Sequence, residues 1–354
     1  MQIIRHKTRQ VSVGGVKIGG NAPVSIQSMT KTRTADIAAT VSQIKRLEKA
    51  GCEIVRLAIK DMAAAQAIKA IKSKTDIPLV ADIHFHYQFA LEAMKNGIDK
   101  IRLNPGNIYK EEEVRAVVAL AKKKKIPIRV GVNSGSVPRG STALVEAMVK
   151  CAKDYVRRLE KMDFYDVVLS LKCSEVMETV EAYRRIAAQC DYPLHLGLTA
   201  SGAFTPGMIK STLGLGVLLS EGIGDTIRVS LTAKPEEEVY VAKEILQALG
   251  LRNFRPELLS CPTCGRCEVD LLKMVEGLEG RLKDFPLNGS CRKPLRVAVM
   301  GCFVNGPGEA GAADLGVAFG NKRGLVFRRG KIIKRLKQSA AMDYLIKEIK
   351  RGQI

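Results

Sequence analysis

The sequence lacks any apolar run approaching the about 18 residues that a helix needs to cross a bilayer. Its first residues, which include Arg5, His6 and Lys7, also lack the continuous apolar core of a secretory signal peptide. No segment of low complexity interrupts the chain. We therefore expect a cytoplasmic protein without a membrane partner.

Acidic residues are few relative to basic ones, because 36 Asp and Glu stand against 57 Lys and Arg in 354 residues, a net charge of +21. Such a field attracts nucleic acid, anionic lipid, anionic metabolites or an acidic protein. Aromatic residues make up only 5% of the chain, and the basic run over residues 328–337 lacks interleaved aromatic side chains that stack on bases. A basic nucleic-acid-binding protein therefore remains an alternative, and we expect no nucleic-acid partner.

Short apolar runs rich in Val, Ile and Leu recur eight times, with amphipathic stretches between them. The runs are residues 24–26, 54–57, 79–83, 101–103, 128–132, 167–171, 194–198 and 227–229. Strand-then-helix units at this spacing predict parallel strands. Eight units in about 250 residues favour a closed (β/α)8 TIM barrel over an open doubly wound sheet.

The repeat fades after Leu251, and the chain then becomes rich in Cys and Gly and finally basic. This change predicts a barrel domain over residues 1–252, a short linker, and a second, smaller domain over residues 256–354. We expect that domain to contain a helix near 269–281, a buried strand at 296–300, short strands near Val317 and Val326, and a terminal helix at 342–350.

Basic side chains follow several predicted barrel strands, at the end where TIM barrels place their active sites. They are Arg56, Arg102, Arg129, Lys172 and Arg228. Asp82 is the one obvious acid among them, so these cations exceed the local supply of carboxylate partners. Guanidinium groups bind phosphate oxygens in a fork geometry. The pattern therefore predicts a polyanionic ligand, most simply a diphosphate.

A His-x-His pair, His84 and His86, lies beside Asp82. This arrangement leaves open a zinc-dependent TIM-barrel phosphate-ester hydrolase. His195 is the only further histidine near a strand, and its mid-strand position predicts that it fills the barrel interior. The sequence therefore favours one hydrogen-bonding and one exposed histidine over a zinc site.

The nine cysteines are an odd number, which is typical of metal or redox chemistry rather than of a disulfide framework. Cys261 and Cys264 form a C-x-x-C pair that lets one loop present two thiolates to a single metal centre. Cys302 follows the predicted strand 296–300. Cys267 extends the pair to the ferredoxin spacing, whereas Cys291 completes a four-cysteine zinc set. Spacing alone leaves an iron–sulfur cluster and a structural zinc both open.

Taken together, these motifs resemble the 4-hydroxy-3-methylbut-2-en-1-yl diphosphate synthase family, in its short two-domain bacterial form. The matching segments are residues 25–30, 80–85, 102–107, 218–225, Cys-Pro-Thr-Cys at 261–264 and Asn-Gly-Pro-Gly-Glu at 305–309. The resemblance covers nearly the whole chain. It implies a TIM barrel followed by an α+β domain like those of sulfite reductases, which carries a [4Fe-4S] cluster.

The family reaction opens 2-C-methyl-D-erythritol 2,4-cyclodiphosphate reductively, with loss of water and uptake of two electrons. Its product is (E)-4-hydroxy-3-methylbut-2-enyl diphosphate, an isoprenoid precursor of the methylerythritol phosphate pathway. The resemblance also implies reduced flavodoxin or ferredoxin as the electron donor, which the basic C-terminal region helps to dock. It further implies a homodimer in which the cluster domain of one subunit covers the barrel of the other.

Residue roles follow from the same resemblance. The cluster ligands are Cys261, Cys264, Cys302 and Glu309, and Glu309 is also catalytic because a carboxylate is an exchangeable iron ligand. The diphosphate contacts are Arg56, Arg102, Arg129 and Lys172, assisted by Asn133 and Arg228. Asp82 is the best proton-handling group. One departure matters: the family commonly reads Thr-Glu-Ala-Gly where this chain reads Thr-Ala-Ser-Gly at 199–202, so an acid is missing at Ala200.

Overall fold

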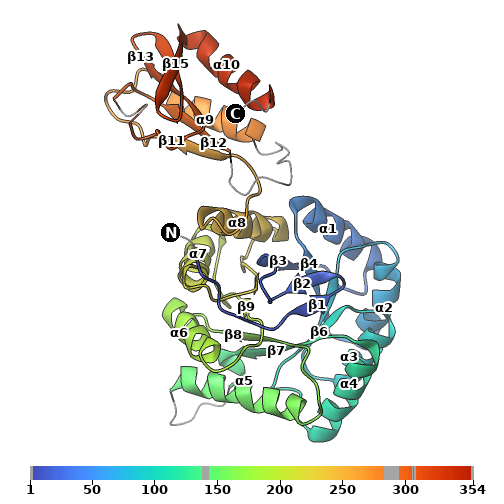
Figure 1. The fold of residues 1–354 in the computed structure, drawn as a ribbon. Helices are drawn as coiled ribbons and strands as arrows, with labels where there is room; N and C mark the ends of the chain where they lie inside the picture. Colours follow the sequence, from blue (N-terminus) through green and yellow to red (C-terminus); the bar gives the residue numbers. More distant parts are fainter. Residues whose placement is uncertain (1–2, 138–142, 283–294, 305, 307, 352–354) are drawn as a thin grey trace. The chain divides into compact units, whose positions relative to one another are not determined.

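The computed structural model describes residues 3–137, 143–282, 295–304, 306 and 308–351. The chain divides into two compact units, Met1–Arg252 and Asn253–Ile354 (Figure 1). Within the described ranges, no helix combines the length and apolar character needed to cross a membrane.

The first unit is built on eight parallel strands in the order β8-β7-β6-β5-β4-β3-β10-β9. Their bounds are β3 Ser25–Met29, β4 Ile54–Ile59, β5 Leu79–Ile83, β6 Lys100–Leu103, β7 Ile128–Asn133, β8 Val167–Lys172, β9 His195–Leu196 and β10 Thr226–Ile227. A parallel bridge between Leu169 and Leu194 joins β8 to the β9 segment and completes the ring. The TIM barrel predicted from the eightfold repeat is therefore confirmed.

One helix follows each barrel strand and lies on the outside of the ring (Figure 1). The helices are α1 Ile37–Ala50, α2 Met62–Lys72, α3 Tyr87–Lys95, α4 Glu111–Lys124, α5 Leu144–Glu160, α6 Val176–Ala187, α7 Phe204–Ser220 and α8 Pro235–Ala248. Local sequence determines where several of them begin. Asp36 and Asp61 cap α1 and α2 by accepting hydrogen bonds from Ala39 and Ala64 N–H, at 3.0 and 2.8 Å.

A short hairpin closes the end of the barrel at which the strands begin. It pairs β1 Val11–Val13 with β2 Val16–Ile18. Val13 and Ile18 form a buried apolar cluster with Ile54 and Val80, which lie at the starts of β4 and β5. Because side chains alternate along a strand, Arg56 and Asp82, two residues further on, face the interior at the opposite end. The hairpin thus leaves the carboxyl ends of the strands for the site.

The second unit contains a five-stranded sheet in the order β11-β12-β13-β14-β15. The strands are β11 Glu257–Ser260, β12 Arg296–Met300, β13 Leu315–Gly320, β14 Arg323–Arg328 and β15 Lys331–Lys337. The first three are parallel, and the last two pair antiparallel. Two helices, α9 Leu271–Leu282 and α10 Gln338–Arg351, pack on one face of the sheet through a shared apolar core.

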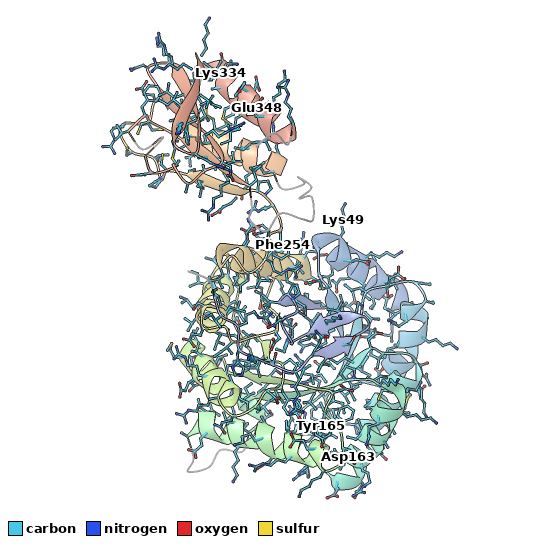
Figure 2. The ribbon with its side chains drawn as sticks, viewed as in Figure 1. Lys49, Asp163, Tyr165, Phe254, Lys334 and Glu348 are labelled. Carbon is cyan, nitrogen blue, oxygen red and sulfur yellow. The ribbon has the colours of Figure 1, made fainter. Side chains whose placement is uncertain are left out.

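Two of these strands lie outside the elements expected from the sequence. β11 has only four residues, and β15 is exposed along almost its whole length. An exposed edge strand carries no alternating apolar pattern. The many lysines and arginines of β15 therefore did not indicate a strand. Figure 2 labels Lys334 of β15. Its ammonium lies 4.5 Å from the centre of the Tyr344 ring of α10, and this cation–π contact holds the lysine in place.

Close packing inside the second sheet gives a stability prediction. A Cβ atom at Gly316 of β13 would lie 2.3 Å from the Phe327 ring and 2.9 Å from the Cβ atom of Ala298. We expect Gly316→Ala to lower the free energy of unfolding by about 1–3 kcal/mol, because the core has no room for the methyl group. Urea unfolding of the full chain, with hydrogen exchange of the β12–β14 amides, measures the loss.

The matched control is Gly277→Ala in α9, where no other part of the described chain, apart from the backbone of the helix itself and the two flanking residues, lies within 4 Å of the added Cβ position. It should be neutral or stabilise the protein by up to about 1 kcal/mol, because alanine favours helix. Equal stability of the two variants would contradict the packing argument.

Candidate active site

A cavity of about 280 Å³ opens at the carboxyl ends of the barrel strands. It is lined by Arg56, Asp82, His84, Arg102, Arg129, Asn133, Ser170, Lys172, Leu198, Thr199, Ala200, Arg228 and Ser230. The structure therefore brings into one cavity the seven barrel residues predicted to bind the diphosphate or to handle protons, which are Arg56, Asp82, Arg102, Arg129, Asn133, Lys172 and Arg228. The cavity volume is suited to a small metabolite.

Strand register sets the height of the charged groups in the cavity. Asp82 of β5 lies directly opposite Arg102 of β6, and Arg102 lies opposite Arg129 of β7. Two inward glycines make room for long cationic side chains. A Cβ atom at Gly131 would lie 2.6 Å from Arg102 Nε, and one at Gly197 would lie 2.6 Å from Lys172 Nζ. Small residues on β7 and directly after β9 are thus part of how the site is built.

Asp82 lies at the centre of the charged groups, with 5% of its side chain exposed. Its Oδ1 accepts a hydrogen bond from Arg102 Nη1 at 3.1 Å, and its Oδ2 lies 3.7 Å from Arg56 Nε and 3.5 Å from His84 Nε2. Burial raises the pKa of Asp82, but Arg56, the hydrogen bond with His84, and Arg102 and Arg129 together hold that pKa well below its ordinary value. Asp82 is therefore a carboxylate at neutral pH.

The cations around Asp82 are in excess. Burial and the neighbouring arginines lower the pKa of Arg129 and of Lys172 well below their ordinary values, and burial lowers the pKa of Arg56 to about 10. The Nε and Nη1 atoms of Arg129 are buried and have no hydrogen-bond partner among the described residues. Asp82 is the only carboxylate in the described lining. This arrangement is suited to a polyanion with several oxygen acceptors.

Arg228 forms an ion pair with Glu238, an acid that the sequence analysis did not predict as part of the site. Glu238 of α8 is 1% exposed, and its two oxygens lie 3.3 Å from the Nε and Nη2 atoms of Arg228. Glu238 also accepts hydrogen bonds from Ser28 Oγ at 2.9 Å and from the Leu231 N–H at 3.3 Å. In the sequence, Glu238 is one of three glutamates in the first turn of α8. Acidic residues are common there because they interact favourably with the helix dipole, so its position did not indicate a role in the site.

Two further buried groups lie in the barrel strands. Lys100, the first residue of β6, is fully buried, and burial together with Arg129 and Arg56 lowers its pKa well below the ordinary value. His195 of β9 is also fully buried, and burial with the charge of Lys172 lowers its pKa well below its ordinary value. His195 is therefore a neutral imidazole inside the barrel.

The two histidines of the His-x-His pair have different surroundings. His84 lines the cavity with 48% of its side chain exposed, whereas His86 precedes α3 and packs edge-on against Phe89 at 5.2 Å between ring centres. Across the described parts of the chain, no three His, Cys, Asp or Glu side chains meet as a group that could hold a metal ion.

The predicted cluster ligands occur on loops of the second unit. Cys261 directly follows β11, and Cys302 follows β12 by two residues. These strands are parallel neighbours with Ser260 opposite Val299, so the two loops leave the sheet side by side. The Gly301 N–H donates to Cys261 Sγ at 3.4 Å, a contact of the kind that stabilises metal-bound thiolates.

The remaining ligand candidates differ in exposure. Cys264 and Glu309 are exposed, and Cys302 is buried. Cys267 donates to the Val269 carbonyl at 3.2 Å and packs against the core beneath α9. Cys291, the alternative zinc ligand, lies outside the described residues. Three thiols and one carboxylate on neighbouring loops are a donor set that fits an iron–sulfur cluster, although the structure does not show them converged.

The fold and site define a TIM-barrel protein with a polyanion site at its rim and a second, cysteine-bearing unit. Comparison with known families is more specific. Residues 8–243 match the family described as GcpE TIM-barrel domain, and residues 257–351 match the GcpE protein C-terminal domain. The chain belongs to the GcpE family.

Curated relatives match over the full length. A protein of Thermodesulfovibrio yellowstonii, named 4-hydroxy-3-methylbut-2-en-1-yl diphosphate synthase (flavodoxin), is 52% identical over 99% of this chain and 100% of its own. A protein of the same name from Caldanaerobacter subterraneus is 51% identical over 98% of both chains.

The solved structures include a dihydropteroate synthase of Stenotrophomonas maltophilia with a similar fold. The match covers 68% of this chain and 98% of that chain, at 15% identity and a TM-score of 0.51. At this identity the similarity shows the fold alone.

The lowered pKa of the buried Lys172 leads to a prediction about proton uptake. Inorganic diphosphate bound in the cavity brings negative charge next to Lys172, whose pKa is lowered in the free protein. The anion raises that pKa, so the protein should take up protons on binding at pH values between the free and bound pKa. Calorimetric titration in buffers of different ionisation enthalpy measures the uptake.

Lys172→Met should remove most of this uptake and weaken binding at least tenfold, since one cation of the clamp is lost. Lys45→Met, on the exposed face of α1, is the control and should leave both quantities unchanged. Binding without proton uptake in the unaltered protein would contradict the prediction.

Proposed function

We propose that this chain catalyses the reductive ring opening and dehydration of 2-C-methyl-D-erythritol 2,4-cyclodiphosphate. The product is (E)-4-hydroxy-3-methylbut-2-enyl diphosphate, an isoprenoid precursor, and the protein is an oxidoreductase with flavodoxin as electron donor. The observation that carries the proposal is the cavity, which gathers four arginines and a lysine around one carboxylate. Full-length relatives that carry the synthase name support it.

The cationic lining supplies binding and orientation. The diphosphate oxygens are held by Arg56, Arg102, Arg129 and Lys172, and the neighbouring strands set the spacing of these side chains. Arg228 contacts the substrate with a guanidinium that Glu238 has already oriented, which reduces the rotamer entropy lost on binding. Asn133, at the end of β7, adds a neutral amide donor. The clamp fixes the carbon skeleton in one orientation at the mouth of the cavity.

Asp82 has two tasks in this proposal. Its carboxylate keeps Arg56 and Arg102 in place before the substrate arrives, because each would otherwise be a buried cation without a counter-charge. When the diphosphate binds, its negative charge opposes the field of these arginines. The pKa of Asp82 then rises, while Asp82 remains a carboxylate that can accept a hydrogen bond from a protonated neighbour.

Cys261, Cys264, Cys302 and Glu309 would hold a [4Fe-4S] cluster. When bound, the cluster would pass the two electrons of the reaction to the substrate. Glu309 is a hard oxygen donor among thiolates, and its side chain is exposed, so it would be the most readily exchanged of the four ligands. Its catalytic role would be to yield its place on the iron, which would let the cluster supply Lewis-acid as well as redox chemistry.

The partners and organisation follow the same proposal. Reduced flavodoxin or ferredoxin delivers the electrons, and the exposed basic side chains of β15 suit an acidic carrier. The protein functions in the cytoplasm as a homodimer, in which the cluster domain of one subunit, residues 256–354, covers the barrel of the other, residues 1–252. Family membership favours the synthase over a zinc hydrolase or a nucleic-acid-binding protein.

Turnover under anaerobic conditions tests the function. Protein reconstituted with iron and sulfide, supplied with reduced flavodoxin and the cyclodiphosphate, should form the hydroxybutenyl diphosphate with two electrons consumed per product. Mass spectrometry identifies the product. The proposal would be contradicted if protein with a full complement of iron formed no product even with a strong chemical reductant.

The ligand assignment gives a separate prediction that does not depend on turnover. Cys264→Ser should lose the cluster, measured as bound iron and visible absorbance, because two thiolates and a carboxylate hold it poorly. Cys267→Ser, three residues away, is the matched control and should retain the cluster, since the Cys267 thiol is bonded to the Val269 carbonyl. If Cys267→Ser lost iron and Cys264→Ser kept it, Cys267 would replace Cys264 as the predicted cluster ligand.

Glu309→Ala should keep part of the bound iron while turnover falls at least tenfold, since three thiolates remain but the exchangeable position is altered. Unchanged turnover in this variant would remove Glu309 from the catalytic residues.

A further inference from the structure

The bond changes of the proposed reaction require one proton, and this inference rests on that reaction. Ring opening breaks the bond between a phosphate oxygen and the methyl-bearing carbon. Dehydration breaks the carbon–hydroxyl bond on the adjacent carbon, and a carbon–carbon double bond forms between the two. Two electrons enter from the donor, and the phosphate leaves as an anion without a proton. The hydroxyl group leaves as water only when it gains one proton.

Few groups in the described lining can supply that proton. The arginines belong to the cationic clamp, and a guanidinium group is a poor proton donor. Asp82 is ionised, and Ala200, in a left-handed conformation with φ 51°, presents only a methyl group. Lys172 belongs to the diphosphate clamp, and deprotonation would leave the bound anion without one of its counter-charges. His84 is the remaining titratable side chain.

His84 lies beside the Asp82 carboxylate, an arrangement suited to a proton donor. It follows β5 by one residue, so a rigid strand end positions it. Its Nε2 lies 3.5 Å from Asp82 Oδ2, and about half of its side chain is open to the cavity mouth and solvent. A carboxylate in this position orients an imidazole and stabilises its protonated form. The cavity therefore contains an Asp–His pair at its rim.

We propose that His84 is the catalytic proton donor for the departing hydroxyl group, with Asp82 as its positioning partner. The imidazolium gives its proton to the hydroxyl oxygen, water leaves, and the neutral imidazole regains a proton from solvent through its exposed side. Asp82 keeps its negative charge throughout and acts through His84. This assigns the Asp82 carboxylate a supporting part in proton transfer.

The charged groups that line the same cavity as His84 are Asp82 on β5, Arg56 on β4, Arg102 on β6, Arg129 on β7, Lys172 on β8 and Arg228 directly after β10. Asp82 is the one carboxylate in the described lining, and its Oδ2 lies 3.5 Å from His84 Nε2. Asp82 is therefore the group that can orient the His84 imidazole.

The test compares His84→Gln with His86→Gln in the cluster-loaded protein. His86 lies two residues away, outside the cavity lining, and packs on Phe89. We expect His84→Gln to lower kcat by about 10²–10⁴-fold and to change KM less than threefold. The wild-type kcat should fall as the pH is raised, and this limb should be absent in His84→Gln, because a glutamine side chain has no acidic proton to lose. His86→Gln should keep the wild-type profile.

Bound iron and the affinity for inorganic diphosphate show that each variant is folded and loaded. A His84→Gln protein with wild-type kcat, or with reduced kcat but an unchanged alkaline limb, overturns the inference and leaves the proposed function standing. A loaded wild-type protein that forms no product overturns the proposed function, and the role of His84 falls with it.

Discussion

The site depends on one ion-pair network, the Asp82 carboxylate between Arg56 and Arg102. Buried cations on neighbouring parallel strands repel one another, and burial removes the water that would screen them. Asp82 lowers this cost without cancelling it, so the free protein keeps an excess of positive charge at the rim. A polyanionic ligand would supply the missing counter-charge. The same carboxylate lies 3.5 Å from His84 Nε2, and the proposed proton delivery rests on that contact.

The two ends of the barrel illustrate a division between stability and function. At one end the β1–β2 hairpin packs Val13 and Ile18 onto Ile54 and Val80. At the other end the same strands, two residues further along, carry charged groups. Strand alternation places both sets inside the barrel, and the apolar set stabilises the fold that holds the charged set in place. In the second unit, the helices cover one face of the sheet, and the cysteine loops leave from the ends of β11 and β12.

Much of the fold was predictable because buried parallel strands have a strong signature. Eight apolar runs at regular intervals gave the barrel, and the residues following them included the main cationic groups of the cavity. The strand β15 was missed because exposure removes the apolar pattern on which such predictions rely. Glu238 was missed because its sequence position already has a local explanation, and only the fold brings it within 3.3 Å of Arg228. His84 and His86 look alike in the sequence, yet only His84 lines the cavity.

The sequence by itself determined the family, the strand–helix order and the residue types at the strand ends. These properties are encoded locally, in periodicity and in short motifs. Only the tertiary structure decided that Asp82 is held as a carboxylate, that Arg129 has unsatisfied buried donors, and that His84 has a carboxylate behind it. Each of these depends on distances and burial among residues far apart in the chain, and electrostatic energy varies steeply with both.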